Sequence, residues 1–431
     1  MLCYQRLDAL EEKVFSEAVR QVRQIHATHN GMTLSDDDVL DISVNYDGSW
    51  LTRGHSSHIG IGCVVDVLTG ICLDAHVMCN YCHVCQTTGN KLLQEKPLEY
   101  AAWLVKHMDI CDKNFAGSSG MMEVEAARVL WGRSVSRHNL RYTVMLSDGD
   151  TKTFQELSKI KPYGDQVTIE KEECINHVSK RLGTALRNLV TDCRKKGITL
   201  GGRGYGQLTL NTIRKLTIYY NRAIRGGKTV ADMKRAVMAS LRHGYSTDDK
   251  PQHDLCPHGA ASWCFYQAAL AQNKPPGPHA KLVHTPLNFK KLNPPLKPVY
   301  QRLTEDQLLQ RCVSGKTQNS NECLHSSVWV RCPKDKFACK NRVRFAVVTG
   351  AREFNFGPAA ALNTAKFYGF TTGCNMKRLN KARECKRVLG SIRFKKDQLN
   401  KRRDTVRAAK LKRQEELIRL EGGAAYAAGQ F

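Results

Sequence analysis

The chain lacks long apolar runs, internal repeats and a recognisable nucleotide-binding loop. No stretch approaches the roughly 18 apolar residues that a membrane span needs, and the opening MLCYQR lacks the basic-then-apolar pattern of a signal peptide. We therefore expect an intracellular protein with no membrane partner. The glycine-rich GGRGYG segment follows no clear strand and has no Gly-Lys-Ser/Thr, which argues against nucleotide hydrolysis.

Acidic residues are also few, and this shortage leaves a strong positive charge. The 431 residues include 66 Lys and Arg against 40 Asp and Glu, a net charge of +26. Such a balance favours a polyanionic partner, because cationic side chains neutralise phosphates and release counterions. Nucleic acid is the first interpretation and an anionic membrane surface the second. The length and the 42% hydrophobic content are those of a globular protein with roughly two to three domains.

The first half of the chain has the pattern of a mixed α/β domain. Apolar spacing predicts an amphipathic helix over residues 7–28 and a second helix over 121–136. Short β-branched segments predict strands, and TFQELSKI predicts a short helix between the last two. The predicted strands cover residues 39–47, 58–68, 71–79, 141–150 and 166–175. Three strands, a helix, a strand, a helix and a strand form the ribonuclease H-like order, with an antiparallel meander that continues into parallel strands.

Beyond this sheet we predict a mainly helical insertion and a basic helical C-terminal tail. Between Lys377 and Arg413 there are sixteen Lys or Arg and three acids, a net charge of +13. The tail is interpreted either as an arm along a phosphate backbone or as a solvated helix that serves in nuclear import. The predicted parts are an N-terminal helical segment 1–38, sheet core 39–176, insertion 177–299, the rest of the core 300–370 and the tail 371–431.

Seventeen cysteines, an odd number, and a Cys-x-x-Cys pair predict reduced thiols and zinc rather than disulfides. Cys82 and Cys85 are spaced to bind one metal, and His107 and Cys111 at i and i+4 share a helix face. We predict a structural zinc site from these four residues, which orders the crossover 79–111. Cys79 either replaces one ligand or is buried.

A second zinc site is a hypothesis with an open alternative. Cys174 and His177 lie at the start of the insertion, and the segment that closes it contains His253, Cys256, His258 and Cys264. One zinc ion held by residues of both groups would clamp the two ends together. In the alternative, Cys174 and His177 only pack and form hydrogen bonds.

Three acids stand in distinctive settings: Asp47 and Asp148 end predicted strands, and Glu322 lies in a helix-compatible run. Phosphodiester cleavage can use two divalent ions about 3.5–4 Å apart, and such hard cations need carboxylate oxygens. An Asp-Gly pair by itself is a common turn, so only the combination of the three acids indicates this chemistry.

The sequence around these acids resembles the Mutator-like transposases, which share their pattern with a class of bacterial insertion-sequence transposases. The resemblance rests on Asp47, Ser147-Asp148-Gly149, the Cys-x-x-His of Cys174 to His177, and TQNSNE ending at Glu322. It spans roughly residues 40–360, and the 173 residues between Asp148 and Glu322 leave room for an all-helical insertion. Competing acids are Glu305, Asp306 and Glu353 for the third position and Asp150 for the second.

This resemblance implies a ribonuclease H-like core that nicks DNA at transposon ends and joins the 3′ hydroxyl to target DNA with Mg²⁺ or Mn²⁺. Asp47, Asp148 and Glu322 would hold the metal ions. The implied partner is DNA, bound by a homo-oligomer in the nucleus, with no small-molecule substrate. Only about 40 residues precede the first catalytic strand, so we expect a truncated copy. The alternative function is a domesticated or truncated protein that binds DNA or chromatin without cleaving it.

Overall fold

The computed structural model describes all residues except 1–5, 53–55, 150, 203, 391 and 394–431. Two compact units are present: Leu7–Ala351, and Met1–Arg6 together with Arg352–Phe431. The distal part of the predicted basic tail, from residue 394 onward, and the alternative acid Asp150 lie outside the described residues. No described helix is long and apolar enough to cross a membrane.

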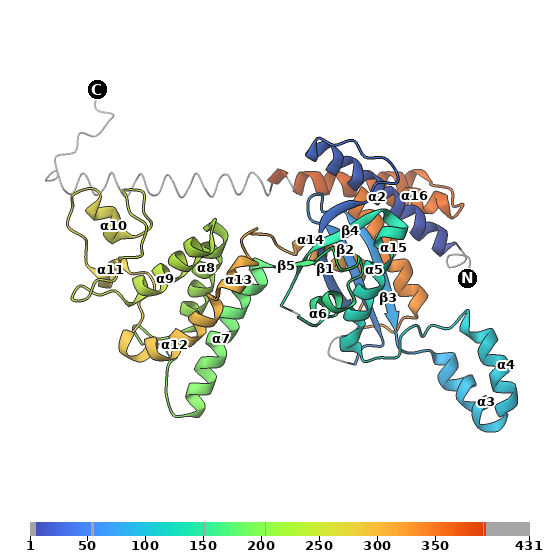
Figure 1. Cartoon of the computed structure of the whole chain (residues 1–431), viewed down its shortest axis with the longest axis horizontal. Coiled ribbons are helices and arrows are strands. Elements are labelled where there is room, and N and C mark those ends of the chain that lie inside the picture. Colours follow the sequence, from blue (N-terminus) through green and yellow to red (C-terminus); the bar gives the residue numbers. More distant parts are fainter. Residues whose placement is uncertain (1–5, 53–55, 150, 203, 391, 394–431) are drawn as a thin grey trace. The chain divides into compact units, whose positions relative to one another are not determined.

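A five-stranded mixed sheet forms the centre of the larger unit (Figure 1). Its strands are β1 (Leu40–Trp50), β2 (Ile59–Asp66), β3 (Cys72–Cys79), β4 (Leu140–Ser147) and β5 (Glu170–Glu173). The spatial order is β3-β2-β1-β4-β5. Strands β1, β2 and β3 pair antiparallel, whereas β4 is parallel to both β1 and β5. The five predicted strands and their order along the chain are confirmed, and the fold is mixed α/β.

Helices cover both faces of this sheet. Helix α5 (Met122–His138) packs against β1, β2, β3 and β4, and α14 (Asn319–Arg331) packs against β1 and β2. Alternation along β1 assigns the faces, because successive side chains point to opposite sides. Tyr46 donates a hydrogen bond to the Glu123 carbonyl of α5, while Asn45 donates to Ser320 of α14. Asp47 therefore points toward α14.

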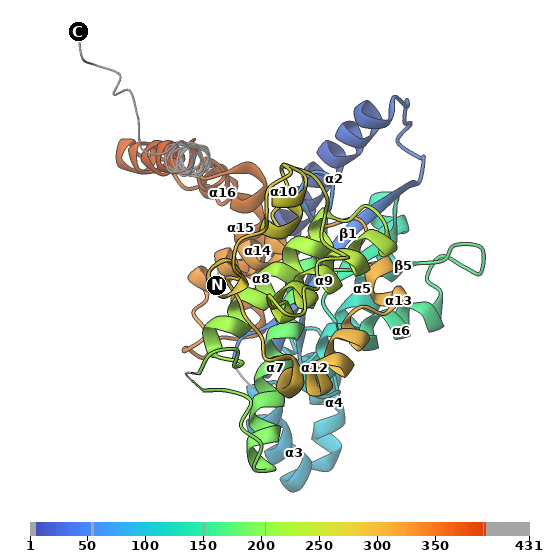
Figure 2. The same ribbon diagram turned by 90° about the vertical axis from the view of Figure 1, so that its left-hand side faces the viewer.

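The helical insertion has its own hydrophobic core. Figure 2 shows its helices grouped together: α7 (Ile175–Lys195), α8 (Leu210–Gly226), α9 (Val230–Tyr245), α12 (Phe289–Leu303) and α13 (Asp306–Gln310). Two further short helices, α10 (Phe265–Leu270) and α11 (His279–Leu282), lie in the segment between α9 and α12. The insertion is mainly helical, as predicted.

Helix α12 runs through NPPLKP, although proline normally interrupts a helix. Pro294, Pro295 and Pro298 all lie inside the helix. Each proline removes a backbone donor, at a cost of about 3 kcal/mol in a regular helix interior. Burial of Leu296 and Tyr300 in the insertion core offsets this cost. Tertiary packing therefore overrides the local signal.

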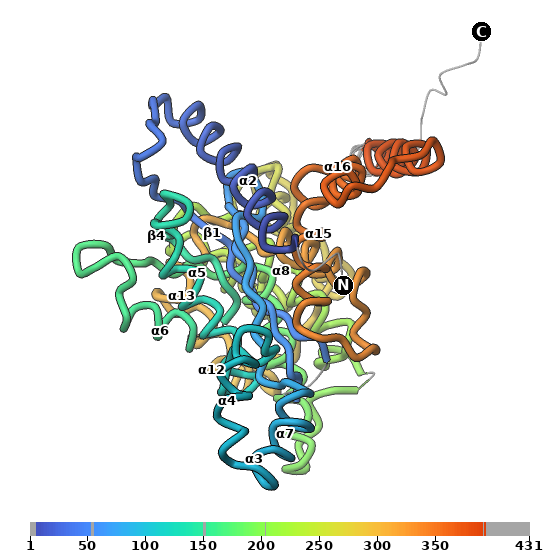
Figure 3. The backbone as a smooth tube through the Cα atoms, turned by 90° about the vertical axis from the view of Figure 1, so that its right-hand side faces the viewer, coloured from blue at the N-terminus to red at the C-terminus, as the bar shows by residue number. Residues whose placement is uncertain are grey.

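The remaining described elements lie outside the sheet and the insertion. The crossover after β3 contains η1 (Cys85–Gly89), α3 (Asn90–Glu95) and α4 (Pro97–Met108), seen as the blue-green helices of Figure 3. Helix α2 (Leu7–Asn30) packs against β3, and α6 (Thr151–Ile160) packs against α5. The other elements are η2 (Ser119–Met121), α15 (Lys340–Phe356) and α16 (Ala360–Phe367).

Candidate active site and metal centres

Asp47 and Asp148 lie at the same level on neighbouring parallel strands. Asn45 of β1 is paired with Leu146 of β4. Two residues further along both strands, this register brings Asp47 opposite Asp148. Their side chains are 23% and 42% exposed, so both carboxylates are accessible from solvent. The sheet therefore presents two of the three predicted acids side by side. The prediction that both acids end strands holds for Asp148, which follows β4, but is wrong for Asp47, because β1 continues to Trp50.

The Asn-rich motif attaches the start of α14 to the sheet. Gln318 Nε2 donates a hydrogen bond of 2.8 Å to the Tyr46 carbonyl of β1. Asn321 Nδ2 donates one of 3.4 Å to the Cys63 carbonyl of β2. Both anchoring side chains are buried. These bonds hold the first turn of α14, and with it Glu322, against the edge of the sheet that carries Asp47.

Two histidines lie beside the three acids. His177 of α7 has Nδ1 at 3.9 Å from Asp148 Oδ2 and Nε2 at 3.4 Å from Glu322 Oε1. His325, one turn after Glu322 on α14, has Nδ1 at 3.5 Å from Asp47 Oδ2. The sequence interpretation did not include His325. Its i, i+3 spacing from Glu322 was the available signal, since residues three apart share a helix face.

His177 lies between Asp148 and Glu322, and His325 lies beside Asp47, so the three carboxylates do not form a tight cage. Among the described residues, the groups of metal-ligating side chains whose ligand atoms all lie within 4.8 Å of one another are built from Cys and His only. A site with two metal ions accommodates carboxylate oxygens that lie further apart, because ions about 3.5–4 Å apart each bind oxygens at about 2.0–2.6 Å. The donor set of three solvent-accessible carboxylates thus fits hard divalent cations.

A basic cleft with a volume of about 760 Å³ opens beside Asp148. Its lining includes the cationic residues Lys180, Arg181, Arg302 and Arg311, which outnumber the acids Asp148, Glu173 and Glu305, and also His177. Arg181 is held by an ion pair of 2.6 Å with the buried carboxylate of Glu173. A Cβ atom at Gly149 would lie 2.2 Å from Arg181 Nη2, so glycine at this position leaves room for the Arg181 guanidinium beside Asp148.

A family model described as Mutator-like transposase matches residues 4–264, more than half of the 431 residues. The chain belongs to the Mutator-like transposase family. The matched region contains Asp47, Asp148 and His177, and it ends before Glu322. Comparison with curated proteins gave no match, and comparison with solved structures gave none either. The function of this family member is accordingly related to that of transposases.

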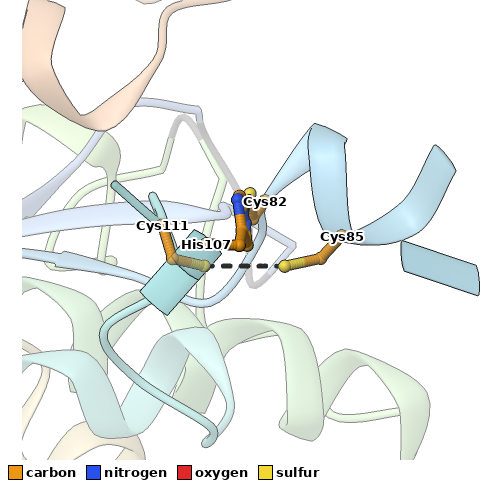
Figure 4. A group of neighbouring side chains, drawn as sticks. All are labelled: Cys82, Cys85, His107 and Cys111. Atoms are coloured by element: carbon orange, nitrogen blue, oxygen red, sulfur yellow. Dashed lines mark hydrogen bonds between the residues drawn. The ribbon is translucent and has the colours of Figure 1, made fainter. Parts of the chain in front are cut away.

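The crossover of this family member brings together the four residues predicted as a zinc site (Figure 4). Cys82 Sγ lies 3.4 Å from His107 Nε2, and Cys85 Sγ lies 3.5 Å from Cys111 Sγ. Tetrahedral zinc with ligands at about 2.0–2.3 Å needs ligand atoms about 3.4–3.8 Å apart, so these separations fit. Burial raises the pKa of the Cys82 thiol, but hydrogen bonds with the backbone of Cys85 and Asp112 and with His107 lower it to about 6.

A second Cys/His group lies in the insertion, and it corrects the hypothesis of a shared zinc clamp. Its members are His243, His253, Cys256 and Cys264. Neither Cys174 nor His177 belongs to it: the Cys174 thiol accepts a hydrogen bond of 3.4 Å from the Gln318 backbone, and His177 lies between two acids. His258 contacts Gln267 instead. His243 was missed because it lies within a regular helical pattern.

Proposed function

We propose that this chain catalyses metal-dependent cleavage and strand transfer of DNA, with Asp47, Asp148 and Glu322 as its catalytic triad. The observation that carries the proposal is the convergence of the three acids at one edge of the sheet: Asp47 and Asp148 share a level on parallel strands, and His177 links Asp148 to Glu322. The strand order β3-β2-β1-β4-β5, antiparallel and then parallel, supports a ribonuclease H-like core.

Each part of the site has a distinct task in this reaction. The acids would hold Mg²⁺ or Mn²⁺, which activates the attacking hydroxyl and stabilises the leaving oxygen. His177 and Lys180 contact Glu322, at 3.4 and 3.8 Å, and hold its carboxylate toward the sheet. Arg302 and Arg311 line the adjoining cleft and would bind backbone phosphates of the strand being cut.

DNA is the proposed partner, bound by a homo-oligomer in the nucleus, and zinc at Cys82, Cys85, His107 and Cys111 has a structural role. The alternative function is DNA binding without cleavage. That alternative is favoured by the spacing of the three acids, which form no group with all ligand atoms within 4.8 Å.

The deciding experiment is cleavage of supercoiled plasmid, and joining of an oligonucleotide 3′ hydroxyl, by the purified chain with Mg²⁺ or Mn²⁺. We expect Asp47→Asn, Asp148→Asn and Glu322→Gln each to lower the rate at least about 100-fold, or about 2.7 kcal/mol of transition-state stabilisation. DNA binding should persist, because the basic cleft is unchanged.

The matched control is Asp306→Asn, which alters an exposed acid paired with Lys234 at 2.6 Å. Its cleavage rate should equal that of the unmodified chain. Loss of activity in Asp306→Asn but not in Glu322→Gln would identify Asp306, rather than Glu322, as the third catalytic acid. Tight DNA binding with no cleavage by the unmodified chain would establish the binding-only alternative.

A further inference from the structure

We infer that the insertion contains a zinc centre of its own, with His243, His253, Cys256 and Cys264 as ligands, and that Asp248 and His279 orient the His253 ligand. The four ligand side chains lie with their ligand atoms within 4.8 Å of one another, and three of the four are buried. His243 comes from the last turn of α9, and the other three come from the segment that follows it.

The ligand separations match tetrahedral zinc. Cys264 Sγ lies 3.3 Å from His253 Nδ1, and Cys256 Sγ lies 3.8 and 3.9 Å from the Nδ1 atoms of His243 and His253. Two thiolates and two imidazoles around one ion need edges of about 3.4–3.8 Å. The set has the soft donors that zinc prefers and no carboxylate oxygen, which distinguishes it from the acidic site on the sheet.

A hydrogen-bonded chain fixes the orientation of His253. Its Nε2 atom lies 2.9 Å from His279 Nε2, and His279 Nδ1 lies 2.6 Å from Asp248 Oδ1. Ser246 Oγ is also 2.9 Å from His253 Nε2. With His253 Nδ1 directed at the thiols, Nε2–H donates to His279 and His279 Nδ1–H donates to Asp248. A ligating imidazole characteristically donates its other N–H in this way, which fixes its tautomer and strengthens the metal bond.

Much of the packing of this segment surrounds the proposed ligands: Phe265 and Tyr266 contact the His253 ring, and Trp263 contacts the His243 ring. Between α9 and α12 its helices are α10, with 6 residues, and α11, with 4. A buried cluster joins the segment to Ala239 of α9, and the other two buried members, Cys256 and Cys264, are proposed ligands. Because ligands stand at the centre of this packing, metal binding would contribute to the folding energy of the segment. The zinc therefore has a structural role and closes the segment back onto α9.

Zinc content of the full-length chain, measured by mass spectrometry, tests the centre itself. We expect two zinc ions per chain, one in Cys85→Ser, one in Cys256→Ser and none in the double variant. Cys256→Ser should also expose residues 246–287 to limited proteolysis, whereas Cys85→Ser should not. If Cys256→Ser is insoluble, Cys85→Ser still decides, because absence of zinc from Cys85→Ser contradicts the inference.

Asp248→Asn tests the orienting chain, with Asp254→Asn as its matched control. Asp254 belongs to the same segment, but its carboxylate pairs with Arg242 at 2.7 Å rather than with His279. In chelator competition we expect Asp248→Asn to weaken retention of one zinc ion about 10- to 100-fold, and Asp254→Asn to leave it unchanged. Equal retention in both variants would refute the orienting role. Neither measurement involves DNA, so failure here is separate from failure of the proposed cleavage activity.

Discussion

Gln318 is the side chain that most directly connects Glu322 to the sheet. It is 1% exposed, and its amide donates to the Tyr46 carbonyl at 2.8 Å. Gln318→Ala leaves this carbonyl without its donor, so we expect a loss of about 1–3 kcal/mol of unfolding free energy. Because the first turn of α14 is then less firmly held, cleavage should fall as well. Urea unfolding and the plasmid assay measure the two effects.

Gln310→Ala is the comparison for Gln318→Ala. Gln310 is an exposed glutamine at the end of α13, and its replacement should change stability by no more than about 0.5 kcal/mol. Similar unfolding free energies for the two variants would show that the Gln318 hydrogen bond does not hold α14 in place.

Asp74 is the buried acid that joins β3 to α5. Arg133 binds both of its carboxylate oxygens, at 2.7 and 2.8 Å, and His138 lies 3.3 Å away. Burial raises the pKa of Asp74, but the hydrogen bond from His138 and the charge of Arg133 outweigh this and lower it. A lowered folded-state pKa adds stability that is present above the unfolded value of about 3.9 and is lost as the pH falls through the folded value.

We therefore expect Asp74→Asn to destabilise the larger unit by about 3–5 kcal/mol at neutral pH, because Arg133 then lacks its carboxylate partner. The difference from the unmodified chain should shrink below pH about 4. Asp41→Asn, which removes a half-exposed partner of Arg141, should cost less than about 1 kcal/mol. A pH-independent difference, measured by urea unfolding, would contradict the assigned role of the Asp74 charge.

At the scale of the whole molecule, the net charge of +26 predicts DNA affinity that falls steeply with salt. If the cleft beside Asp148 binds phosphates, Arg302→Ala and Arg311→Ala should each lower the slope of log affinity against log salt by about one. Fluorescence anisotropy in an Asp47→Asn background measures binding without cleavage.

Arg128→Ala provides the charge-matched control for this measurement. Arg128 is a surface arginine of α5 that is paired with Glu125 at 2.8 Å and does not line the cleft. In the Asp47→Asn background, Arg128→Ala should leave the slope of log affinity against log salt unchanged. Equal slopes for Arg128→Ala, Arg302→Ala and Arg311→Ala would mean that DNA does not contact the cleft.

Local patterns in the sequence predicted the five strands, the main helices and the residues of the first Cys/His group. Strand and helix periodicity depends on neighbouring residues, and Cys82 with Cys85, like His107 with Cys111, are spaced for one metal within a single turn. The acids Asp47 and Asp148 were recognisable for the same reason, because each one follows an apolar run, although β1 continues past Asp47 to Trp50.

Only tertiary structure decided which distant residues meet. His177 lies between Asp148 and Glu322, although Glu322 is 145 residues away, and His243 joins His253, Cys256 and Cys264 through the return of the chain onto α9. Likewise α12 continues through its prolines because its apolar face is buried. Such pairings depend on how whole elements pack, and packing energy summed over a buried face exceeds any single local preference.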